Sequence, residues 1–304
     1  MVTRELDKNR NSAFSVFRDY YVLTKPGVVQ LLVFTAIVGM FLASPRMAPL
    51  GALIFGSLGI GLAAASGAVV NHILDIRLDA KMARTKSRPM PSGRIKEKNA
   101  IAFALLLGLL GISVLVFFVN TLTAILTFAS LIGYAIIYTV YLKRATPQNI
   151  VIGGAAGAAP PLLGWTAVTD QVESFALILF LIIFTWTPPH FWALALARKE
   201  DYTKAGIPML PVTHGSKLTK SFILYYTMLL LIVSLLPFLT GNSGFLYLFG
   251  ASFLGGGFLY YALKLKFAET SGDSMKTFSY SISYLMALFT FLLLDHYIPA
   301  FWPE

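Results

Sequence analysis

Residues 49–70 have the sequence PLGALIFGSLGIGLAAASGAVV, and residues 71–91 continue as NHILDIRLDAKMARTKSRPMP. The first stretch is uncharged and about as long as the roughly twenty apolar residues that cross a ~30 Å hydrocarbon core as a helix. The second stretch places Asp75 and Asp79 four residues apart, with five Lys or Arg residues between positions 77 and 88. The two stretches together predict a membrane-spanning helix whose polar end carries an unusual concentration of charge.

The composition extends this prediction to the whole chain of 304 residues. Hydrophobic residues make up 57% and charged residues 12%, with a mean hydropathy of +0.72, whereas a soluble domain is about 25% charged. Apolar runs of about twenty residues recur, which favours helices over barrel strands of about 9–11 residues. We therefore predict an all-α polytopic membrane protein. The lack of cysteine excludes disulfides, thiolate metal sites and cysteine nucleophiles.

Nine transmembrane helices are predicted, forming a bundle around a central cavity. Their ranges are 28–44, 50–74, 99–119, 121–141, 149–168, 175–197, 221–240, 244–265 and 278–298. The loop between spans 2 and 3 and the loop between spans 6 and 7 are expected to cap the cavity from the cytoplasm. The chain then divides into a cytoplasmic N-terminal segment (1–27), a single transmembrane domain (28–298) and an extracytoplasmic tail (299–304).

The basic residues support this count. Of 24 Lys and Arg residues, all except Arg46 fall in the N-terminal segment or in loops that nine spans place on the same side. The positive-inside rule puts that side, and the N-terminus, in the cytoplasm and the C-terminus outside the cell membrane. The net charge of +10 therefore reflects topology and an anion site, and it does not indicate a nucleic-acid partner, because no basic soluble domain is present.

A similar charged stretch follows the sixth predicted span. Residues 195–211, ALARKEDYTKAGIPMLP, end an apolar run with acidic residues, bases and prolines, as residues 71–91 do. Two such units in parallel orientation would bring both loops over one cavity. The repeat is weak, and its similarity is short.

The spacing of Asn71, Asp75 and Asp79 puts three oxygen-bearing side chains on one face of a helix. Such a face suits Mg²⁺, which binds one or two carboxylates and completes its shell with water and substrate phosphate. Cations that can bind a phosphate follow in the same loop and in two others; they are Arg84, Lys86, Arg88, Lys143, Arg144, Lys199 and Lys204. The alternative is an ordinary charged helix end, in which Asp75 pairs with a neighbouring base.

Recurrence of acid and base in three loops favours a metal-diphosphate site over that alternative. A diphosphate site beside a membrane cavity suits a substrate with a phosphorylated head and an apolar tail, such as a polyprenyl diphosphate. The metal and the cations would neutralise the leaving diphosphate. The allylic carbocation would then need a cavity that excludes water.

The residues that carry this chemistry resemble a known group. The pattern Asn71-x₃-Asp75-x₃-Asp79 followed by RTKSRP resembles the first aspartate-rich motif of the UbiA-type intramembrane prenyltransferases. Four separated motifs are similar, in order, to the protoheme IX farnesyltransferase (haem O synthase) family. They are DAKMARTKSRPMPSGRI (79–95), TPQNIVIGGAAGAAPPLLGW (146–165), TWTPPHFWALAL (185–196) and DYTKAGIPMLPV (201–212).

The resemblance implies that farnesyl diphosphate, haem B and water give haem O and diphosphate. It implies Mg²⁺ as cofactor, Asn71, Asp75 and Asp79 as the metal motif, and Arg84 as a further catalytic residue at the diphosphate. It also suggests that the product passes to a haem A synthase or to terminal oxidase assembly.

The second acidic motif departs from the superfamily, which shows several spaced aspartates there. Glu200 and Asp201 are adjacent and therefore point about 100° apart on a helix. Asp201 as a single metal-bound carboxylate and a purely phosphate-binding loop both remain open.

A haem acceptor directs attention to the histidines. His190 lies at membrane depth near Trp192, after two prolines expected to open the helix locally. His190, His72 and Trp192 are predicted as haem contacts. The alternative for His190 is a neutral side chain bonded to a freed carbonyl, and for His72 a proton acceptor or a polar helix end. Tyr134, Tyr138 and Tyr141 are expected near one face of span 4, either as packing or as a lining for the carbocation.

Other functions remain as alternatives at this stage. Within the enzyme class, the acceptor could be an aromatic or quinone precursor. A transporter of an anionic lipid would carry its charges near the bilayer midplane, whereas here they gather at one edge. A non-catalytic haem-binding membrane protein would not need the ladder of Asn71, Asp75 and Asp79.

Overall fold

The computed structural model describes residues 13–268 and 270–301, which form helices and loops without any strand. The longer helices are α2 (Ala13–Leu23), α3 (Pro26–Leu42), α4 (Ser57–Leu74), α6 (Glu97–Phe118), α7 (Thr121–Ile132), α9 (Asn149–Ala158), α10 (Pro160–Thr169), α11 (Ser174–Ala197), α14 (Gly215–Ser234), α16 (Phe245–Phe267) and α17 (Asp273–Phe301). Two π-helices, η1 (Ala52–Gly56) and η2 (Gly133–Leu142), interrupt the α-helical runs. Short helices close the loops: α5 (Ile76–Asp79), α8 (Lys143–Ala145), α12 (Lys199–Ala205), α13 (Leu210–Thr213) and α15 (Leu236–Leu239).

The predicted all-helical membrane fold is confirmed. Within the described residues, eight continuous helical stretches are long and apolar enough to cross a membrane, and α2 with α3, bent by 55°, supplies a ninth if the pair counts as one span. Two helices begin earlier than predicted, at Gly215 and Asp273 instead of 221 and 278. The extra turns carry lysines, whose long stems can lie along an apolar surface while the charge stays in water.

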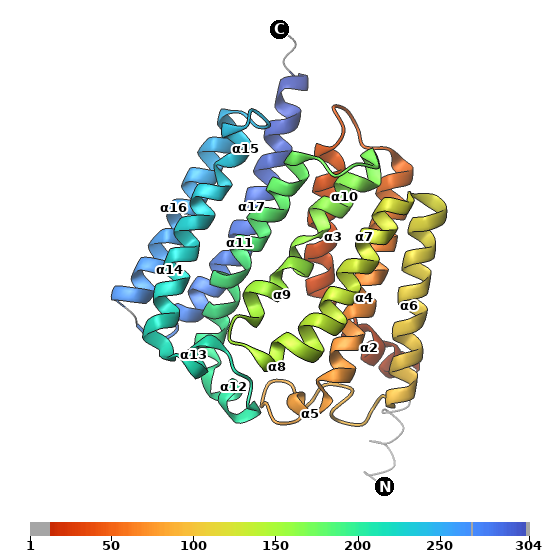
Figure 1. The fold of residues 1–304 in the computed structure, drawn as a ribbon, viewed down its shortest axis with the longest axis vertical. Helices are drawn as coiled ribbons and strands as arrows, with labels where there is room; N and C mark the ends of the chain where they lie inside the picture. Colours follow the sequence, from red (N-terminus) through yellow and green to blue (C-terminus); the bar gives the residue numbers. More distant parts are fainter. Residues whose placement is uncertain (1–12, 269, 302–304) are drawn as a thin grey trace.

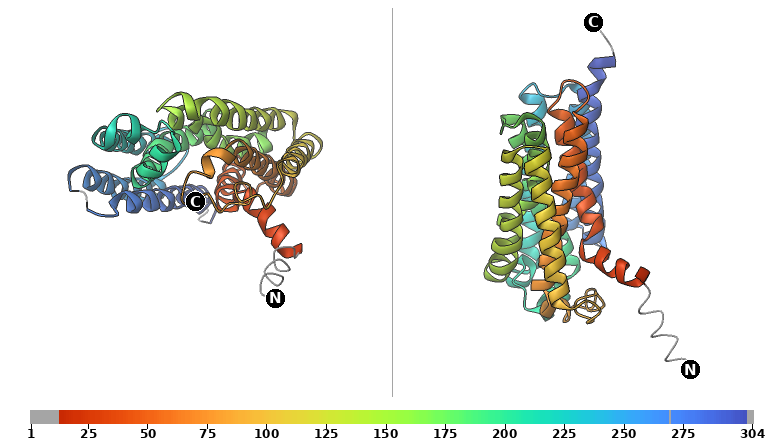
Figure 2. Two further views of the ribbon diagram at one scale, coloured as in Figure 1. Left: turned by 90° about the horizontal axis from the view of Figure 1, so that it is seen from below. Right: turned by 90° about the vertical axis from the view of Figure 1, so that its right-hand side faces the viewer.

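The spans form a flattened bundle with two distinct ends (Figure 1). The loops and short helices around α5, α8 and α12, which carry most of the bases, lie at one end, here called the basic end. Helix α2 leaves the bundle at this end and points outward (Figure 2). The predicted tail at 299–304 is helical as far as Phe301, while residues 1–12 of the N-terminal segment and residues 302–304 lie outside the described part.

Glycines bring two pairs of helices into backbone contact. A Cβ on Gly39 of α3 would lie 2.2 Å from the carbonyl oxygen of Pro161, and one on Gly164 of α10 would lie 1.8 Å from that of Ala36. Gly59 and Gly111 interlock α4 and α6 in the same reciprocal way. Lipid offers no hydrophobic force between helices, so such close van der Waals approach is what holds spans together.

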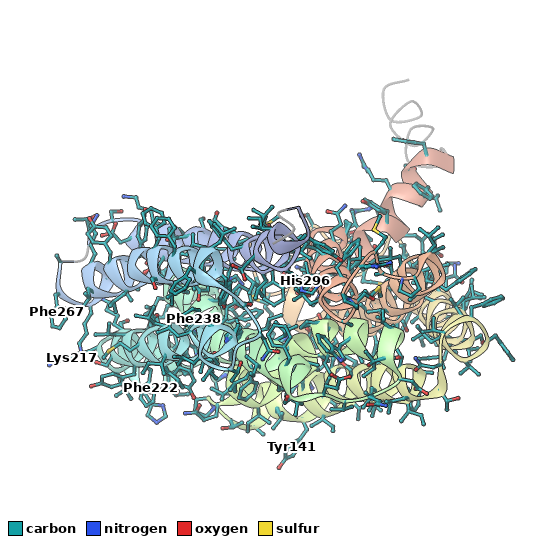
Figure 3. All side chains as sticks on the ribbon, turned by 90° about the horizontal axis from the view of Figure 1, so that it is seen from above. Tyr141, Lys217, Phe222, Phe238, Phe267 and His296 are labelled. Carbon is teal, nitrogen blue, oxygen red and sulfur yellow. The ribbon has the colours of Figure 1, made fainter. Side chains whose placement is uncertain are left out.

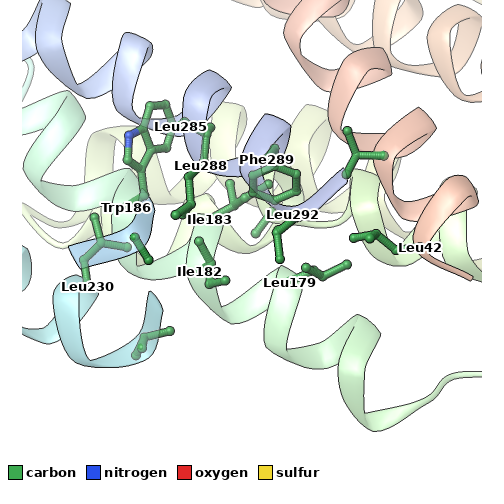
Figure 4. Packing of buried hydrophobic residues seen from close by; sticks show 14 of the residues in the cluster. Leu42, Leu179, Ile182, Ile183, Trp186, Leu230, Leu285, Leu288, Phe289 and Leu292 are labelled. Carbon is green, nitrogen blue, oxygen red and sulfur yellow. The ribbon is translucent and has the colours of Figure 1, made fainter. Parts of the chain in front are cut away.

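A core of large side chains holds the other half of the bundle. Leu179, Ile182 and Ile183 of α11 pack against Leu288 and Phe289 of α17 (Figure 4). Helix α11 continues through Pro188 and Pro189 without a break, contrary to the expected local opening. The hydroxyls of Thr185 and Thr187 in the preceding turn donate to the carbonyls of Leu181 and Ile183.

Candidate functional site

The predicted ladder is buried at the basic end, and the helix breaks within it. Helix α4 ends at Leu74, Asp75 takes a non-helical conformation (φ −93°, ψ 3°), and Asp79 closes the short helix α5. Asn71, Asp75 and Asp79 are 5%, 3% and 2% exposed. Buried carboxylates are costly unless they are paired, so the partners of these residues define the site.

Each ladder residue meets a cation from a different part of the chain. The Lys143 ammonium pairs with Asp75 Oδ2, and Arg88 donates to Asp79 Oδ2 at 2.8 Å. Lys25 Nζ donates to Asn71 Oδ1 at 2.5 Å. Three positive groups therefore converge on three oxygen-bearing side chains, an arrangement suited to binding a polyanion together with a metal ion.

Lys25 reaches the ladder from an unusual backbone position. It precedes Pro26 at the start of α3 in the left-handed region (φ 50°, ψ 59°), which non-glycine residues seldom adopt. Such strain persists only where the surroundings impose it, and it gathers at functional sites. In the sequence, Lys25 is a cation directly before an apolar span, a position that predicts membrane topology but not a place in the site.

Further polar contacts fix the ladder in place. Asn71 Nδ2 donates to Asp75 Oδ2 at 3.0 Å and to Thr139 Oγ1 at 3.4 Å. Thr139 in turn donates to the carbonyl of Tyr134 at 2.8 Å, and Thr85 donates to the carbonyl of Asp79 at 2.8 Å. Sequence reasoning missed both threonines, because nothing in their spacing distinguishes them from packing residues.

The π-helix η2 changes which tyrosines share a face. Tyr134 and Tyr138 stack with ring centroids 5.7 Å apart, whereas Tyr141 is 68% exposed on the outside of the bundle. The expectation that all three lie near one face was therefore wrong for Tyr141. A π-helix bonds i to i+5 and turns less per residue than the ~100° of an α-helix, so a position seven residues on no longer returns to the same face.

The two charged loops meet, as the sequence predicted. Met82 lies in one buried cluster with Ala205 and Ile207 of the second loop, and Figure 1 shows α5 and α12 at the same end of the bundle. Burial raises the pKa of the Tyr202 hydroxyl on α12, while the charges of Arg84 and Arg88 act in the opposite direction. Tyr202, also missed from sequence, therefore lies within electrostatic reach of the first loop.

The remaining predicted cations surround this centre at its outer edge. Arg84, Lys86 and Lys204 are exposed, and Lys199 is half-buried. Arg144 is exposed and donates to the carbonyl of Leu74 at 3.3 Å. Asp201 is half-buried on α12. Their roles toward diphosphate or metal stay predictions.

The oxygen atoms at the ladder fit a hard divalent cation. Asp75 Oδ1 is buried and has no hydrogen-bond partner, and Asp79 supplies a second carboxylate. No group of three or more His, Asp or Glu side chains is gathered for a metal among the described residues. The two carboxylates of Asp75 and Asp79 are the donor set expected for Mg²⁺, which takes one or two carboxylates and completes its shell with phosphate and water.

The histidines occupy two separate surroundings. His72 is 1% exposed, its ring nitrogens make no hydrogen bond, and Nδ1 lies 3.8 Å from Asp79 Oδ2. His190 is also buried, with Nδ1 2.7 Å from Ser281 Oγ and its ring stacked on Trp186 at 4.2 Å. His72 therefore belongs to the ladder, while His190 packs against α17.

Trp192 faces another direction on α11. It is fully buried against Phe222 and Tyr226 of α14, and its indole N–H has no partner. A haem contact at Trp192 stays a prediction, as it does for His190 and His72.

The family follows from comparison with known proteins. The UbiA prenyltransferase family matches residues 32–292. The chain belongs to the UbiA prenyltransferase family. Among the relatives within it, proteins named protoheme IX farnesyltransferase are 57% identical in Teredinibacter turnerae, over 98% of this chain and 96% of the relative, and 60% identical in Marinobacter nauticus, over 93% of each. The resemblance expected from the four motifs is confirmed.

Solved structures of UbiA-fold proteins share the architecture. A digeranylgeranylglyceryl phosphate synthase superposes with a TM-score of 0.77 at 22% identity, covering 92% of this chain and 98% of that one. A UbiA homolog from Archaeoglobus fulgidus, described as bound to GPP and Mg²⁺, superposes with a TM-score of 0.62 at 15% identity, covering 90% and 99%. At these identities the likeness establishes the fold.

Proposed function

We propose that this chain transfers a farnesyl group from farnesyl diphosphate to a vinyl group of haem B, with hydration, giving haem O and diphosphate. The observation that carries the proposal is the buried ladder with its three converging cations, in a chain 57–60% identical to proteins named protoheme IX farnesyltransferase. The ladder supplies the chemistry for the diphosphate, and the relatives supply the identity of the acceptor.

The cations at the ladder would stabilise the leaving group. As the bond between the allylic carbon and oxygen breaks, negative charge grows on the diphosphate. Lys25, Arg88 and Lys143 are already gathered and partly desolvated, so they need little reorganisation to meet that charge. Arg84 and Lys86, on the exposed loop, would close over the outer phosphate together with Arg144, Lys199 and Lys204.

Mg²⁺ would be held by Asp75, Asp79 and the amide oxygen of Asn71. When bound, it would act as a Lewis acid on the diphosphate oxygens. The support is the donor set, above all the buried free Oδ1 of Asp75. The Archaeoglobus relative bound to GPP and Mg²⁺ adds support through the shared fold. A second metal at Asp201 has weaker support, since that residue stands beside Glu200 and between lysines.

The atom balance defines what the acceptor site must do. The farnesyl carbon forms a bond to the terminal vinyl carbon of haem, which moves the positive charge to the carbon next to the porphyrin ring. Water then adds to that carbon and loses a proton. The protein must therefore exclude water during ionisation, admit one molecule afterwards and provide a proton acceptor instead of a donor. The stacked Tyr134 and Tyr138 suit a lining for the carbocation, because aromatic faces attract a cation.

The residues proposed to contact haem are His72 on α4 and His190 and Trp192 on α11. A histidine nitrogen is the usual axial ligand of haem iron. In His190 the Nδ1 side is already bonded to Ser281, so Nε2 would be the nitrogen offered to iron. His72 lies nearer the proposed diphosphate site than His190 does, with Nδ1 3.8 Å from Asp79 Oδ2. It is also a candidate for the proton acceptor.

The basic end would face the cytoplasm of a multi-pass cell-membrane protein, with the N-terminus inside and the C-terminus outside. The support is the gathering of bases at one end, with Arg46 in a loop at the other. Both substrates would then enter from the membrane.

The product would pass to a haem A synthase or to terminal oxidase assembly, because a farnesylated haem is too apolar to diffuse freely through water.

The test is incubation of the purified chain with haem B, farnesyl diphosphate and Mg²⁺, followed by mass analysis of the porphyrin. The expected product carries the farnesyl group plus one water. Farnesylation of an added quinone precursor in place of haem would assign a different acceptor, and an unmodified haem under reducing conditions would refute the proposal.

A further inference from the structure

A second gathering of cations lies away from the ladder, where α14 begins and α16 ends. A cavity of about 290 Å³ opens there, lined by Lys217, Lys220, Ser221, Lys266 and Phe267. The two helices pack side by side. Figure 3 shows Lys217 and Phe267 near each other at the outer edge of the bundle.

Two of these lysines have no acidic partner in the part of the chain that the structure describes. Lys217 and Lys266 form no ion pair there, whereas nearby Lys264 lies 3.4 Å from Asp273. The Lys266 ammonium instead lies 5.4 Å from the ring centroid of Tyr225 and 5.2 Å from that of Phe267. Aromatic rings can hold a cation but do not neutralise it, and no carboxylate of the described residues offsets the charges of Lys217 and Lys266.

The surface next to the cavity is apolar. Tyr225, Met228 and Ile232 lie along the outer side of α14, and Tyr260 and Leu263 lie on α16, all exposed. The ligand that matches both parts has an anionic head and apolar tails. Ammonium groups are donors for phosphate oxygens. The Ser221 hydroxyl, which in the structure donates to the carbonyl of Lys217 at 3.3 Å, can rotate to serve as a further donor.

We propose that this cavity binds the phosphate of an anionic glycerophospholipid, with the acyl chains lying along α14 and α16. The site is separate from the ladder and does not depend on the proposed reaction. Its position at the basic end suits this ligand, since basic pockets between transmembrane helices are known to bind such head groups.

Native mass spectrometry of the delipidated full-length chain would test the proposal, using phosphatidylglycerol and phosphatidylcholine with identical acyl chains. Phosphatidylglycerol is expected to bind at least tenfold more tightly. Replacing Lys217→Gln and Lys266→Gln together should weaken that binding about fivefold per lysine and roughly 25-fold in all. The matched control is Lys96→Gln with Lys98→Gln, exposed lysines of the same end at the start of α6, which should leave binding unchanged.

Equal weakening in the control pair would overturn the proposal, because it would reveal a diffuse attraction of the whole end. Equal affinity for the two lipids would also overturn it, as would displacement of phosphatidylglycerol by millimolar inorganic phosphate, which would assign the cavity to a free anion. A milder variant, Ser221→Ala, removes only the hydroxyl donor to the phosphate and should weaken phosphatidylglycerol binding less than the loss of either lysine does.

Discussion

Replacing Asp75→Asn tests the ladder most directly. The substitution preserves the shape of the side chain while removing its charge. In the structure, Asp75 Oδ2 accepts from Lys143 and Asn71, and Oδ1 is buried without a partner. The change therefore removes a metal ligand and leaves the Lys143 ammonium, whose side chain is 12% exposed, without its counter-charge.

Two separable effects follow from this geometry. Loss of one preorganised electrostatic contact at a developing charge costs about 10²–10³ in kcat, so turnover should fall by at least that factor. Leaving a buried charge unpaired costs ~3 kcal/mol of stability, so the melting midpoint in detergent should also fall. In the double variant Asp75→Asn with Lys143→Met, stability should recover because no charge is left unpaired, but turnover should stay low.

The assay combines haem product analysis under saturating substrates with thermal unfolding of the same samples. The matched control is Asp19→Asn, which removes a carboxylate paired with Arg94 at 2.9 Å outside the ladder and should keep kcat within about twofold. The ladder hypothesis is refuted if Asp75→Asn keeps more than half of the wild-type turnover. Recovery of turnover in the double variant would show that Asp75 serves only to neutralise the charge of Lys143.

Four further outcomes are expected. Lys25→Met should raise the KM for farnesyl diphosphate roughly tenfold, because one charge-assisted contact is lost, as measured by initial rates. Chelation with EDTA should abolish turnover reversibly, with Mg²⁺ restoring it and the circular dichroism spectrum unchanged. Gly39→Ala should lower the free energy of unfolding by about 3 kcal/mol, and the melting midpoint with it, since the added Cβ would lie 2.2 Å from the Pro161 carbonyl oxygen. Gly27→Ala, whose added Cβ would meet nothing, should leave the midpoint unchanged. His190→Ala should shift the Soret band of bound haem if His190 is the axial ligand.

Each of these expectations has a contrary result. An unchanged KM in Lys25→Met would mean that its strained position serves folding alone. Full turnover in EDTA would remove the metal from the proposal. Equal melting midpoints for the two glycine variants would contradict the backbone contact of α3 with α10, and an unchanged Soret band in His190→Ala would leave His72 or water as the iron ligand.

Local patterns in the sequence were sufficient to predict the spans, the end of the bundle that carries the basic loops, and the ladder. Apolar run length sets whether a helix can cross the hydrocarbon core, so the spans and the all-helical fold could be predicted without any tertiary contact. The placement of bases predicted which loops share an end, as Figure 1 shows. The ladder of Asn71, Asp75 and Asp79 was visible because its members are four residues apart.

Only the tertiary structure decided which groups complete the site. Lys25, Thr139 and Lys143 reach the ladder from contacts 46 and 68 residues apart in sequence, and no periodicity reports such distances. The π-helical register that turns Tyr141 outward depends on how η2 packs against its neighbours, notably the close contact of Gly153 with Tyr138. Hydrophobicity and residue spacing are local properties of the sequence and therefore predict the helices. The pairing of each cation with its carboxylate is set by how the helices pack.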